Sequence, residues 1–213
     1  MKSALTLADF RPLAVQLVAA LAAANDEITS LDAALGDGDL GVTCRLGLKA
    51  VLDSPGEATG NLADALLKAG MAFNSAGAST FGALVATAAM RAAKYARDNA
   101  IEQWDLPALI GATEAAVAGL QQRGGAALGD KTLLDALIPA LEALKSAHER
   151  GATLAEALAE ATTAAQAGAE STIPLQGKFG RSGWLQERTI GVQDAGATVV
   201  AIAVRTVADY VGA

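Results

Sequence analysis

The chain has 213 residues and a formal net charge of −7; 52% of it is apolar but only 4% is aromatic. The acidic balance argues against a nucleic-acid partner, because phosphate backbones select basic surfaces. The single cysteine, Cys44, excludes an intrachain disulfide framework and favours a reducing, cytoplasmic compartment; we interpret it as a small core residue. The length suits one domain, so we treat 1–213 as a single unit.

The N-terminal segment predicts an amphipathic helix over 7–24 rather than an export signal. Its apolar residues follow i, i+3, i+4 spacing, and the charged Asp9 and Arg11 stand at the start of the apolar run. Thr6 and Asp9 predict a capping pair at its start. No segment reaches the ~18 apolar, uncharged residues of a membrane span, so we expect no membrane association.

Alanine- and leucine-rich stretches separated by glycines predict further helices along the rest of the chain. Capping signals mark several ends, because Asp105 precedes a segment with Pro107 in its first turn and 153–156 is a capping-box pattern. The β-branched run GATVVAIAV permits a strand, but no other run offers a pairing partner, and we predict a helix there. Short connections make neighbouring helices antiparallel, so the expected fold class is all-α. The remaining expected helices are 28–35, 40–53, 60–75, 78–98, 105–122, 131–149, 153–169 and 194–210.

The stretch LDAALGDGDLG, residues 31–41, places Asp32, Asp37 and Asp39 on a glycine-rich connection. Its GDGDLG imitates the dinucleotide fingerprint, but a helical pattern rather than a strand precedes it. An EF-hand loop is excluded as well, because the position of its bidentate glutamate is Leu48. We interpret the stretch as a hard-cation site, in which Mg²⁺ joins carboxylates to the phosphates of a substrate.

Charge counting supports this interpretation of the acidic stretch. Three carboxylates and a fully ionised ATP carry about −7 together, and two Mg²⁺ ions lower this to about −3. Glycines let the carboxylates converge, and free amides at the start of the next helix, 41–43, are expected to hold phosphate oxygens. The alternative is that Gly36 caps one helix and Asp39 the next, which explains one of the three aspartates.

One long connection, 171–196, carries a local basic cluster in an acidic chain. Its basic residues are Lys178, Arg181 and Arg188. Loops of this length inside compact domains are usually functional or disordered, and the aromatic Phe179 and Trp184 weigh against disorder. We predict a lid or substrate-facing loop, with a loose surface segment as the alternative.

Four segments together resemble the nucleotide-binding L subunit, or L-type domain, of dihydroxyacetone kinases. They are LDAALGDGDLGVT (31–43), NSAGASTFGALV (74–85), GGAALGDKTLLDALIPA (124–140) and GRSGWLQERTIGVQDAGAT (180–198). The resemblance covers nearly the whole chain in the family's order and implies a barrel of about eight antiparallel amphipathic helices with the nucleotide at one end. The residue pattern gives nine helical segments, so we expect a short one, such as 28–35, to merge with a neighbour.

The resemblance implies that Asp32, Asp37 and Asp39 hold two Mg²⁺ ions that bridge the phosphates of ATP or ADP. It places the nucleotide contacts on Leu40, Gly41, Val42, Thr43, Ala78, Ser79, Gly124, Leu133, Arg181, Asp194, Ala195 and Gly196. Arg181 is the expected catalytic group, since a guanidinium stabilises charge that shifts during phosphoryl transfer. The SAGAST segment around Ser79, where Gly77 would leave room for a phosphate, is also typical of a small-residue helix contact, and Asp194 of a helix cap. The neighbouring Asp130 and Lys131 have no assigned role.

Four places depart from the family pattern. Leu40 stands where members often have histidine or cysteine, and Gly41-Val42-Thr43 where they often have GTN or GTT. Trp184 stands where a tyrosine is expected, and Ala195 where proline is common. The Leu40 side chain cannot donate to a phosphate, although its backbone amide can. The metal aspartates are intact, so the departures concern the fine contacts and the acceptor.

In the family, the L subunit has no pocket for the carbonyl substrate; a separate K subunit holds a small ketose on a histidine. The lone histidine here, His148, lies in a charged helix end and is interpreted as solvated. Transfer from a Mg²⁺-nucleotide to dihydroxyacetone or a related ketose is therefore expected only in a complex. The donor is either exchanging ATP or a bound ADP rephosphorylated by a phosphoenolpyruvate-dependent phosphotransferase (M-type) component. A nucleotide-responsive module acting on a transcription factor, or a purely structural bundle, is the alternative.

Overall fold

The computed structural model describes residues 1–54 and 60–213. Most of the described chain is helical, as the alanine- and leucine-rich composition predicts. The elements are η1 (Leu7–Asp9), α1 (Phe10–Ala23), α2 (Asn25–Leu35), α3 (Leu40–Asp53), α4 (Leu62–Ala76), α5 (Thr80–Asp98), α6 (Leu106–Gly124), α7 (Leu134–Glu149), α8 (Leu154–Ser171), α9 (Ser182–Leu185), η3 (Gln186–Thr189) and α10 (Ala195–Gly212).

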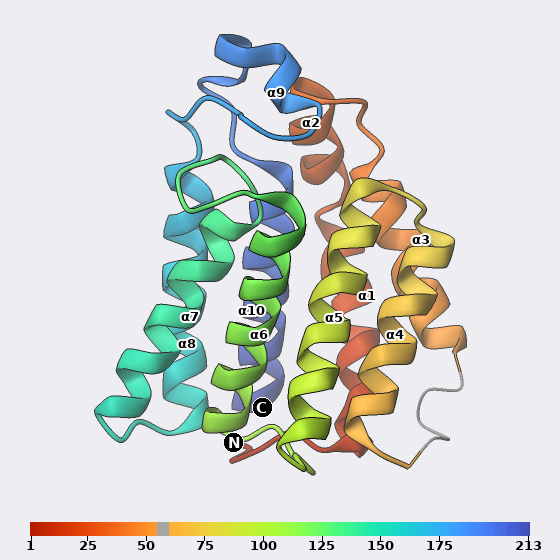
Figure 1. The fold of residues 1–213 in the computed structure, drawn as a ribbon, viewed down its shortest axis with the longest axis vertical. Helices are drawn as coiled ribbons and strands as arrows, with labels where there is room; N and C mark the ends of the chain where they lie inside the picture. Colours follow the sequence, from red (N-terminus) through yellow and green to blue (C-terminus); the bar gives the residue numbers. More distant parts are fainter. Residues whose placement is uncertain (55–59) are drawn as a thin grey trace.

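Eight of the described helices form a closed ring. Following the chain, α1, α3, α4, α5, α6, α7, α8 and α10 each pack against the next, and α10 returns to α1. Figure 1 shows these helices standing side by side with alternating direction, and both chain termini at the same end. The expected all-α barrel of antiparallel helices is confirmed.

The short helix α2 differs from the expectation for 28–35. It does not merge with a neighbour: α1 and α2 are separated by a bend of 63°. It contacts α1, α3 and α10 and lies at one end of the ring, outside the eight-helix wall. The ninth expected segment is therefore a separate helix that partly covers an end of the barrel.

Three predicted capping signals are present in the structure. The Ala108 amide donates to the Asp105 carboxylate at 2.9 Å, and Thr153 and Glu156 form a complete capping box. At the first turn, the Thr6 amide donates to Asp9 Oδ2 at 2.8 Å. These caps fix where the helices begin, because they satisfy amides that lack an intrahelical acceptor.

Small residues let neighbouring helices approach closely. A Cβ on Gly168 of α8 would lie 2.1 Å from the carbonyl oxygen of Asp135 on α7, so only glycine fits at this crossing. Ala157 and Ala161 of α8 are fully buried in the same core. Burial also raises the pKa of the Cys44 thiol to about 12, which makes it the inert core residue that the sequence predicts.

Within the described ranges, α10 is the single helix whose length and mean hydropathy, 1.3, suit a membrane span, although the sequence expectation named none. It carries Arg205 and Asp209, and it packs in the ring against α1, α7 and α8. This place is that of a core helix in a helical barrel.

The two ends of the barrel differ in what covers them. One end, here called the lid end, carries α2, α9 and the N-termini of α3, α5, α7 and α10 (Figure 1). Helix N-termini present unpaired amides and positive partial charge, which favour anionic ligands. The opposite end, here called the termini end, holds both ends of the chain.

Candidate functional site

The structure brings the three predicted metal aspartates together at the lid end. Asp32 lies in the last turn of α2, and Asp37 and Asp39 lie in the connection to α3. Each offers one carboxylate oxygen, and these oxygens all lie within 4.8 Å of one another. We call this group the acidic cluster. Because Mg²⁺ binds oxygen at about 2.1 Å, ligands on opposite sides of one ion lie about 4 Å apart, and the spacing suits cation binding.

Two glycines position the acidic cluster. Gly38 has φ +74°, a left-handed conformation that other residues rarely adopt, and it turns the chain between Asp37 and Asp39. A Cβ on Gly41 would lie 2.6 Å from Thr29 Oγ1, so glycine also allows the first turn of α3 to lie against α2. The carboxylates converge because these two elements pack so closely.

The aspartate that caps α3 in the structure is Asp32, whereas the capping alternative expected Asp39 in that role. The Leu40 amide donates to Asp32 Oδ2 at 2.9 Å, whereas the Asp39 side chain makes no capping bond. Gly36 is extended, with φ −162°, and does not form a left-handed cap. Capping thus explains one oxygen of Asp32 and leaves Asp37 and Asp39 unexplained.

The same contacts narrow the predicted set of phosphate-binding amides. The Leu40 amide is taken by Asp32, and the Thr43 amide donates to the Asp39 carbonyl at 2.9 Å. In this structure both amides therefore already have acceptors and are not free for a phosphate. In the part of the chain that is described, the amides of Gly41 and Val42 have no recorded acceptor, and they remain the candidates at the α3 N-terminus.

The long connection is folded over the acidic cluster. It contains α9 and η3, which the sequence did not predict, and Arg181 immediately before α9 forms an ion pair with Asp37. Figure 1 shows α9 at the lid end, next to α2. The segment is also tied down internally, since the Gly177 amide donates to Thr189 Oγ1 at 2.8 Å. We call residues 173–192 the lid.

The SAGAST segment forms the tight turn between α4 and α5. A Cβ on Gly77 would lie 3.0 Å from the Thr43 carbonyl oxygen, so the space beside this glycine is filled by α3 rather than left open for a phosphate. The alternative of a small-residue helix contact therefore describes Gly77. Ser79 begins α5 and its hydroxyl accepts from the Gly82 amide at 3.0 Å, while Ala78 beside it is exposed.

The remaining predicted nucleotide contacts lie around the same end of the barrel. Leu133 is buried before α7, and a Cβ on Gly196 would lie 3.5 Å from the Leu133 Cβ, so Leu133 packs against the first turn of α10 beside Ala195. Gly124 ends α6 and is exposed, and the Gly125 turn that follows lies against the lid side chain Phe179. The structure thus places all the predicted contact residues at the lid end.

Asp194 carries the electrostatic signature of this end of the barrel. It caps α10 by accepting from the Ala197 amide at 2.7 Å. Burial, with the charges of Asp135 and Asp32, raises its pKa to about 6, although the Ala197 hydrogen bond and the Lys131 charge act in the opposite direction. The carboxylate therefore lies within the field of the acidic cluster, where added positive charge would stabilise its ionised form.

Sequence reasoning gave no role to two residues that hold the lid. Asp130 forms an ion pair with Lys178 of the lid at 2.6 Å, and Lys131 is buried with its ammonium against the lid carbonyls of Leu175 and Val192. The sequence signal that could have indicated this role is the position of Lys131, between the Gly129-Asp130 turn and the start of α7. His148 is exposed in the last turn of α7, as predicted.

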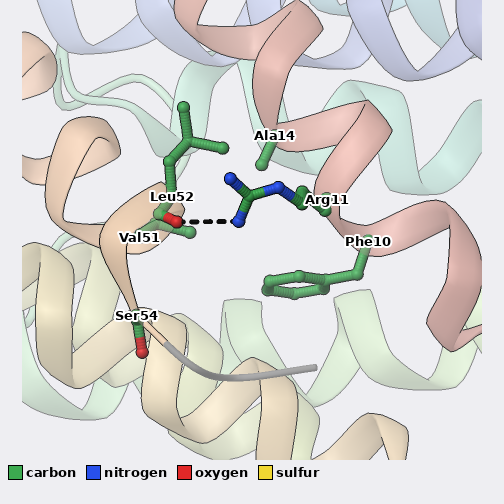
Figure 2. A pocket seen from close by; sticks show the side chains of 6 residues that line it. All are labelled: Phe10, Arg11, Ala14, Val51, Leu52 and Ser54. Atoms are coloured by element: carbon green, nitrogen blue, oxygen red, sulfur yellow. Dashed lines mark hydrogen bonds between the residues drawn. The ribbon is translucent and has the colours of Figure 1, made fainter. Parts of the chain in front are cut away.

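Two hollows in the described structure lie apart from the predicted site. Figure 2 shows the smaller one, about 10 Å³, where Arg11 Nη1 donates to the Leu52 carbonyl at 3.0 Å. The larger, about 280 Å³, lies between α1, α2 and α3 and includes Asp26 and Arg45 in its lining. Neither of these two hollows is lined by a predicted site residue.

Comparison with known proteins gives consistent matches. Residues 34–209 match the DAK2 domain family. The chain is 33% identical over 177 residues to the ADP-binding subunit DhaL of the PEP-dependent dihydroxyacetone kinase of Escherichia coli, covering 83% of each chain. It is 35% identical over 195 residues to a D-erythrulose kinase of Mycolicibacterium smegmatis, covering 90% of this chain and 33% of that protein.

A solved structure matches the fold. The dihydroxyacetone kinase from C. freundii in complex with AMP-PNP and Mg²⁺ superposes with a TM-score of 0.71 and 26% identity. The match covers 95% of this chain and 34% of that one. The chain thus spans most of the E. coli subunit and about a third of the longer kinases.

Proposed function

The chain belongs to the DAK2-domain family, and from this premise we propose that it is the nucleotide-binding subunit of a kinase that phosphorylates a hydroxyl group of a small ketose. The matched relatives are kinases, and one of them is an ADP-binding subunit of comparable length. The observation that carries the proposal is the acidic cluster, Asp32, Asp37 and Asp39, under a lid arginine. Residues 1–213 would form one nucleotide-binding unit.

The donor set of the acidic cluster fits Mg²⁺. One oxygen from each of three carboxylates lies within 4.8 Å of the other two, and within the described ranges the cation paired with this cluster is the Arg181 guanidinium on Asp37. Carboxylate oxygens are hard ligands, and Mg²⁺ in proteins is usually held by carboxylates together with substrate phosphates. We propose two ions, which would neutralise charge on the β- and γ-phosphates of ATP.

The residues around the acidic cluster divide the remaining work. Arg181 would contact the transferred phosphate and stabilise its charge, because a guanidinium offers several donors in a fixed plane. The Gly41 and Val42 amides and the Ser79 hydroxyl would hold phosphate oxygens. The adenine would lie against Gly124, Leu133 and the start of α10, where a Cβ on Gly196 would come within 3.5 Å of the Leu133 Cβ. Asp194 and Ala195, beside Gly196 at the start of α10, would also contact the nucleotide.

The ketose would be supplied by a second protein. The residues proposed for this site bind metal and nucleotide, and the lone histidine, His148, is exposed in the last turn of α7, at the end of that helix away from the lid. We propose a K-type partner that holds dihydroxyacetone or a related ketose and docks at the lid end, in the cytoplasm. The phosphate would come from exchanging ATP or from a bound ADP rephosphorylated by an M-type, phosphoenolpyruvate-dependent component.

Reconstitution tests this proposal. The chain is mixed with a K-type subunit, Mg²⁺ and dihydroxyacetone, and ketose phosphate is measured with ATP or with ADP plus the phosphoenolpyruvate-dependent components. Formation of ketose phosphate in either mixture, lost when EDTA removes the metal, is the expected result. Erythrulose in place of dihydroxyacetone identifies the acceptor. Tight nucleotide binding without transfer in any mixture would instead favour a regulatory binding module.

A further inference from the structure

Lys131 is the largest of the fully buried side chains in the described structure, with 1% of its surface exposed. Its ammonium donates to three backbone carbonyl oxygens, those of Thr172 at 2.7 Å, Leu175 at 3.1 Å and Val192 at 2.5 Å. Thr172 and Leu175 lie where the chain leaves α8 for the lid, and Val192 lies where it returns toward α10. One side chain therefore joins both stems of the lid.

The backbone conformation and the burial of Lys131 both cost free energy, and its three hydrogen bonds offset this cost. Its φ is +61°, in the left-handed region that costs free energy for a residue with a Cβ. Burial lowers the pKa of its ammonium, and the carboxylates of Asp194 and Asp135 act against that shift. The three carbonyls match the three N–H donors of an ammonium, so the group is fully hydrogen-bonded although no carboxylate contacts it directly.

The preceding residue makes a further attachment to the lid. Asp130 Oδ1 forms an ion pair with Lys178 Nζ at 2.6 Å, and its other oxygen accepts from the Ala127 amide at 2.8 Å. Lys178 lies three residues before Arg181. Two consecutive residues in the connection before α7 thus contact the lid at both stems and at the span that leads into Arg181.

We propose that Lys131 is a positioning residue that clamps the two stems of the lid and thereby holds Arg181 at the acidic cluster. The clamp is a property of the fold. Its consequence for catalysis rests on the proposed function, since that function gives Arg181 its task. Lys131 acts through Arg181 and not on the nucleotide, because its ammonium is enclosed by Thr172, Leu175 and Val192.

The substitution Lys131→Met keeps the length and apolar stem of the side chain and removes all three donors. The lid stems then lose their shared partner, and Arg181 samples more positions. Turnover with the K-type partner should fall about 10- to 100-fold, because a phosphate-contacting group misplaced by about 1 Å costs this much. The KM for the Mg²⁺-nucleotide should change less than about 3-fold, since the acidic cluster is intact.

Lid motion is measured without any assumption about function. Trp184 lies on α9, is 88% exposed, and is one of two tryptophans, so Trp104→Phe leaves it as the only reporter. In this background, Lys131→Met should increase the amplitude of nanosecond depolarisation of Trp184. Lys145→Met, on α7 with acidic partners Glu114 and Glu142, is the control lysine and should leave it unchanged.

Loss of stability alone is separated from loss of the clamp by a core variant. Val211→Ala, at the far end of α10, removes buried volume without touching the lid, so it should lower the unfolding midpoint but not change Trp184 depolarisation. If Lys131→Met does not fold, Asp130→Asn removes the single attachment to Lys178 and should give a smaller change in the same direction. If Lys131→Met folds and leaves Trp184 depolarisation unchanged, the clamp is overturned. If Lys131→Met does not fold, unchanged depolarisation in Asp130→Asn overturns it.

The link to Arg181 is tested by a double-mutant cycle on turnover. If Lys131 acts by holding Arg181, then Arg181→Ala with Lys131→Met is no slower than Arg181→Ala alone. Losses that multiply overturn the positioning role. A wild-type chain that transfers no phosphate fails the proposed function, while the Trp184 measurement still decides the clamp.

Discussion

The two ends of the barrel treat carboxylates in opposite ways. At the termini end, the buried Asp9 carboxylate forms an ion pair with Lys2 Nζ at 2.9 Å. It also accepts hydrogen bonds from the Thr6 amide at 2.8 Å, the Thr6 hydroxyl at 2.9 Å and the Tyr210 hydroxyl at 2.8 Å. Burial alone would raise the pKa of Asp9, but the bonds from Lys2, Thr6 and Tyr210 outweigh it and hold that pKa far below its usual range. Asp9 therefore ties the first residues to the last helix.

At the lid end, three carboxylates share far fewer donors. Within the described structure, Asp32 accepts from the Leu40 amide, Asp37 pairs with Arg181, and the Asp39 side chain makes no capping bond. Like charges at this spacing repel, and the repulsion is relieved only when positive charge arrives. A carboxylate saturated by its own chain is structural, whereas a cluster that the chain leaves undersupplied indicates a ligand.

The largest expected effect comes from Asp39→Asn, which removes one charge from the undersupplied cluster. Mg²⁺-dependent ADP affinity should fall at least about 100-fold, because a carboxylate ligand becomes a neutral amide. Without metal, the free energy of unfolding should stay level or rise slightly, since repulsion is relieved. Titration calorimetry and urea unfolding measure the two quantities. Asp98→Asn, an exposed aspartate paired with Lys94 on α5, is the matched control.

Equal ADP affinity in Asp39→Asn and Asp98→Asn would show that Asp39 is not a metal ligand. It would also remove the contrast between the two ends of the barrel, because the undersupplied carboxylates would then have no ligand.

The second effect concerns the cation that the lid supplies. Arg181→Ala should lower turnover with the K-type partner about 100-fold or more, as removal of a guanidinium does in other phosphoryl-transfer sites. ADP affinity should change less than about 10-fold, since the aspartates remain. Steady-state kinetics measure both. Arg188→Ala, in η3 of the same lid, is the control, and an equal loss in that variant would contradict a specific role for Arg181.

The third effect belongs to the termini end. Asp9→Asn should cost about 2 kcal/mol of unfolding free energy at pH 7, because Lys2 and Tyr210 lose a charged acceptor in a buried site. An Asp with a lowered pKa stabilises the fold above its ordinary pKa near 4 and loses this as pH falls, so the variant should also flatten the acid side of the stability profile. Urea unfolding against pH measures this. A change in ADP affinity would contradict the separation of the two ends.

The smallest expected effect is at Asp194, whose pKa is raised to about 6. The folded state binds this proton more tightly than the unfolded chain, so its contribution to stability falls as pH rises from about 4 to 6. Asn also caps helices well, and Asp194→Asn should therefore stabilise the metal-free protein by about 1 kcal/mol at pH 7.5 and by little at pH 4.5. Urea unfolding at the two pH values is the measurement; equal shifts at both would contradict a raised pKa.

The fold was predictable because its signals are local. Capping residues such as Asp105 and Thr153 and the periodicity of small apolar residues fix most helix ends to within a few residues. The antiparallel arrangement follows from short connections, and residues 1–54 and 60–213 contain no strand with which the helical C-terminal run could have paired. That 28–35 belongs to a separate helix, α2, was not predictable from the sequence, since the 63° bend after α1 depends on packing against α3 and α10.

The site was predictable in its chemistry but not in its fine contacts. Three aspartates on one glycine-rich turn predict their convergence, whichever of them caps α3. The choice of Asp32 as that cap depends on how α2 packs against α3, which local sequence does not encode. Gly77 and Lys131 show the same limit, because their partners, Thr43 in one case and the lid stems in the other, are distant in sequence.

The central claim is that the acidic cluster binds divalent cations that hold the nucleotide phosphates. Crystals grown with Mn²⁺ and ADP test it most directly, because the anomalous signal locates the metal independently of the surrounding density. The account predicts anomalous peaks about 2.1 Å from oxygens of Asp32, Asp37 and Asp39, with ADP phosphate on the other side of the metal. Ordered ADP with no peak at these three carboxylates, or a peak elsewhere on the protein, would contradict it.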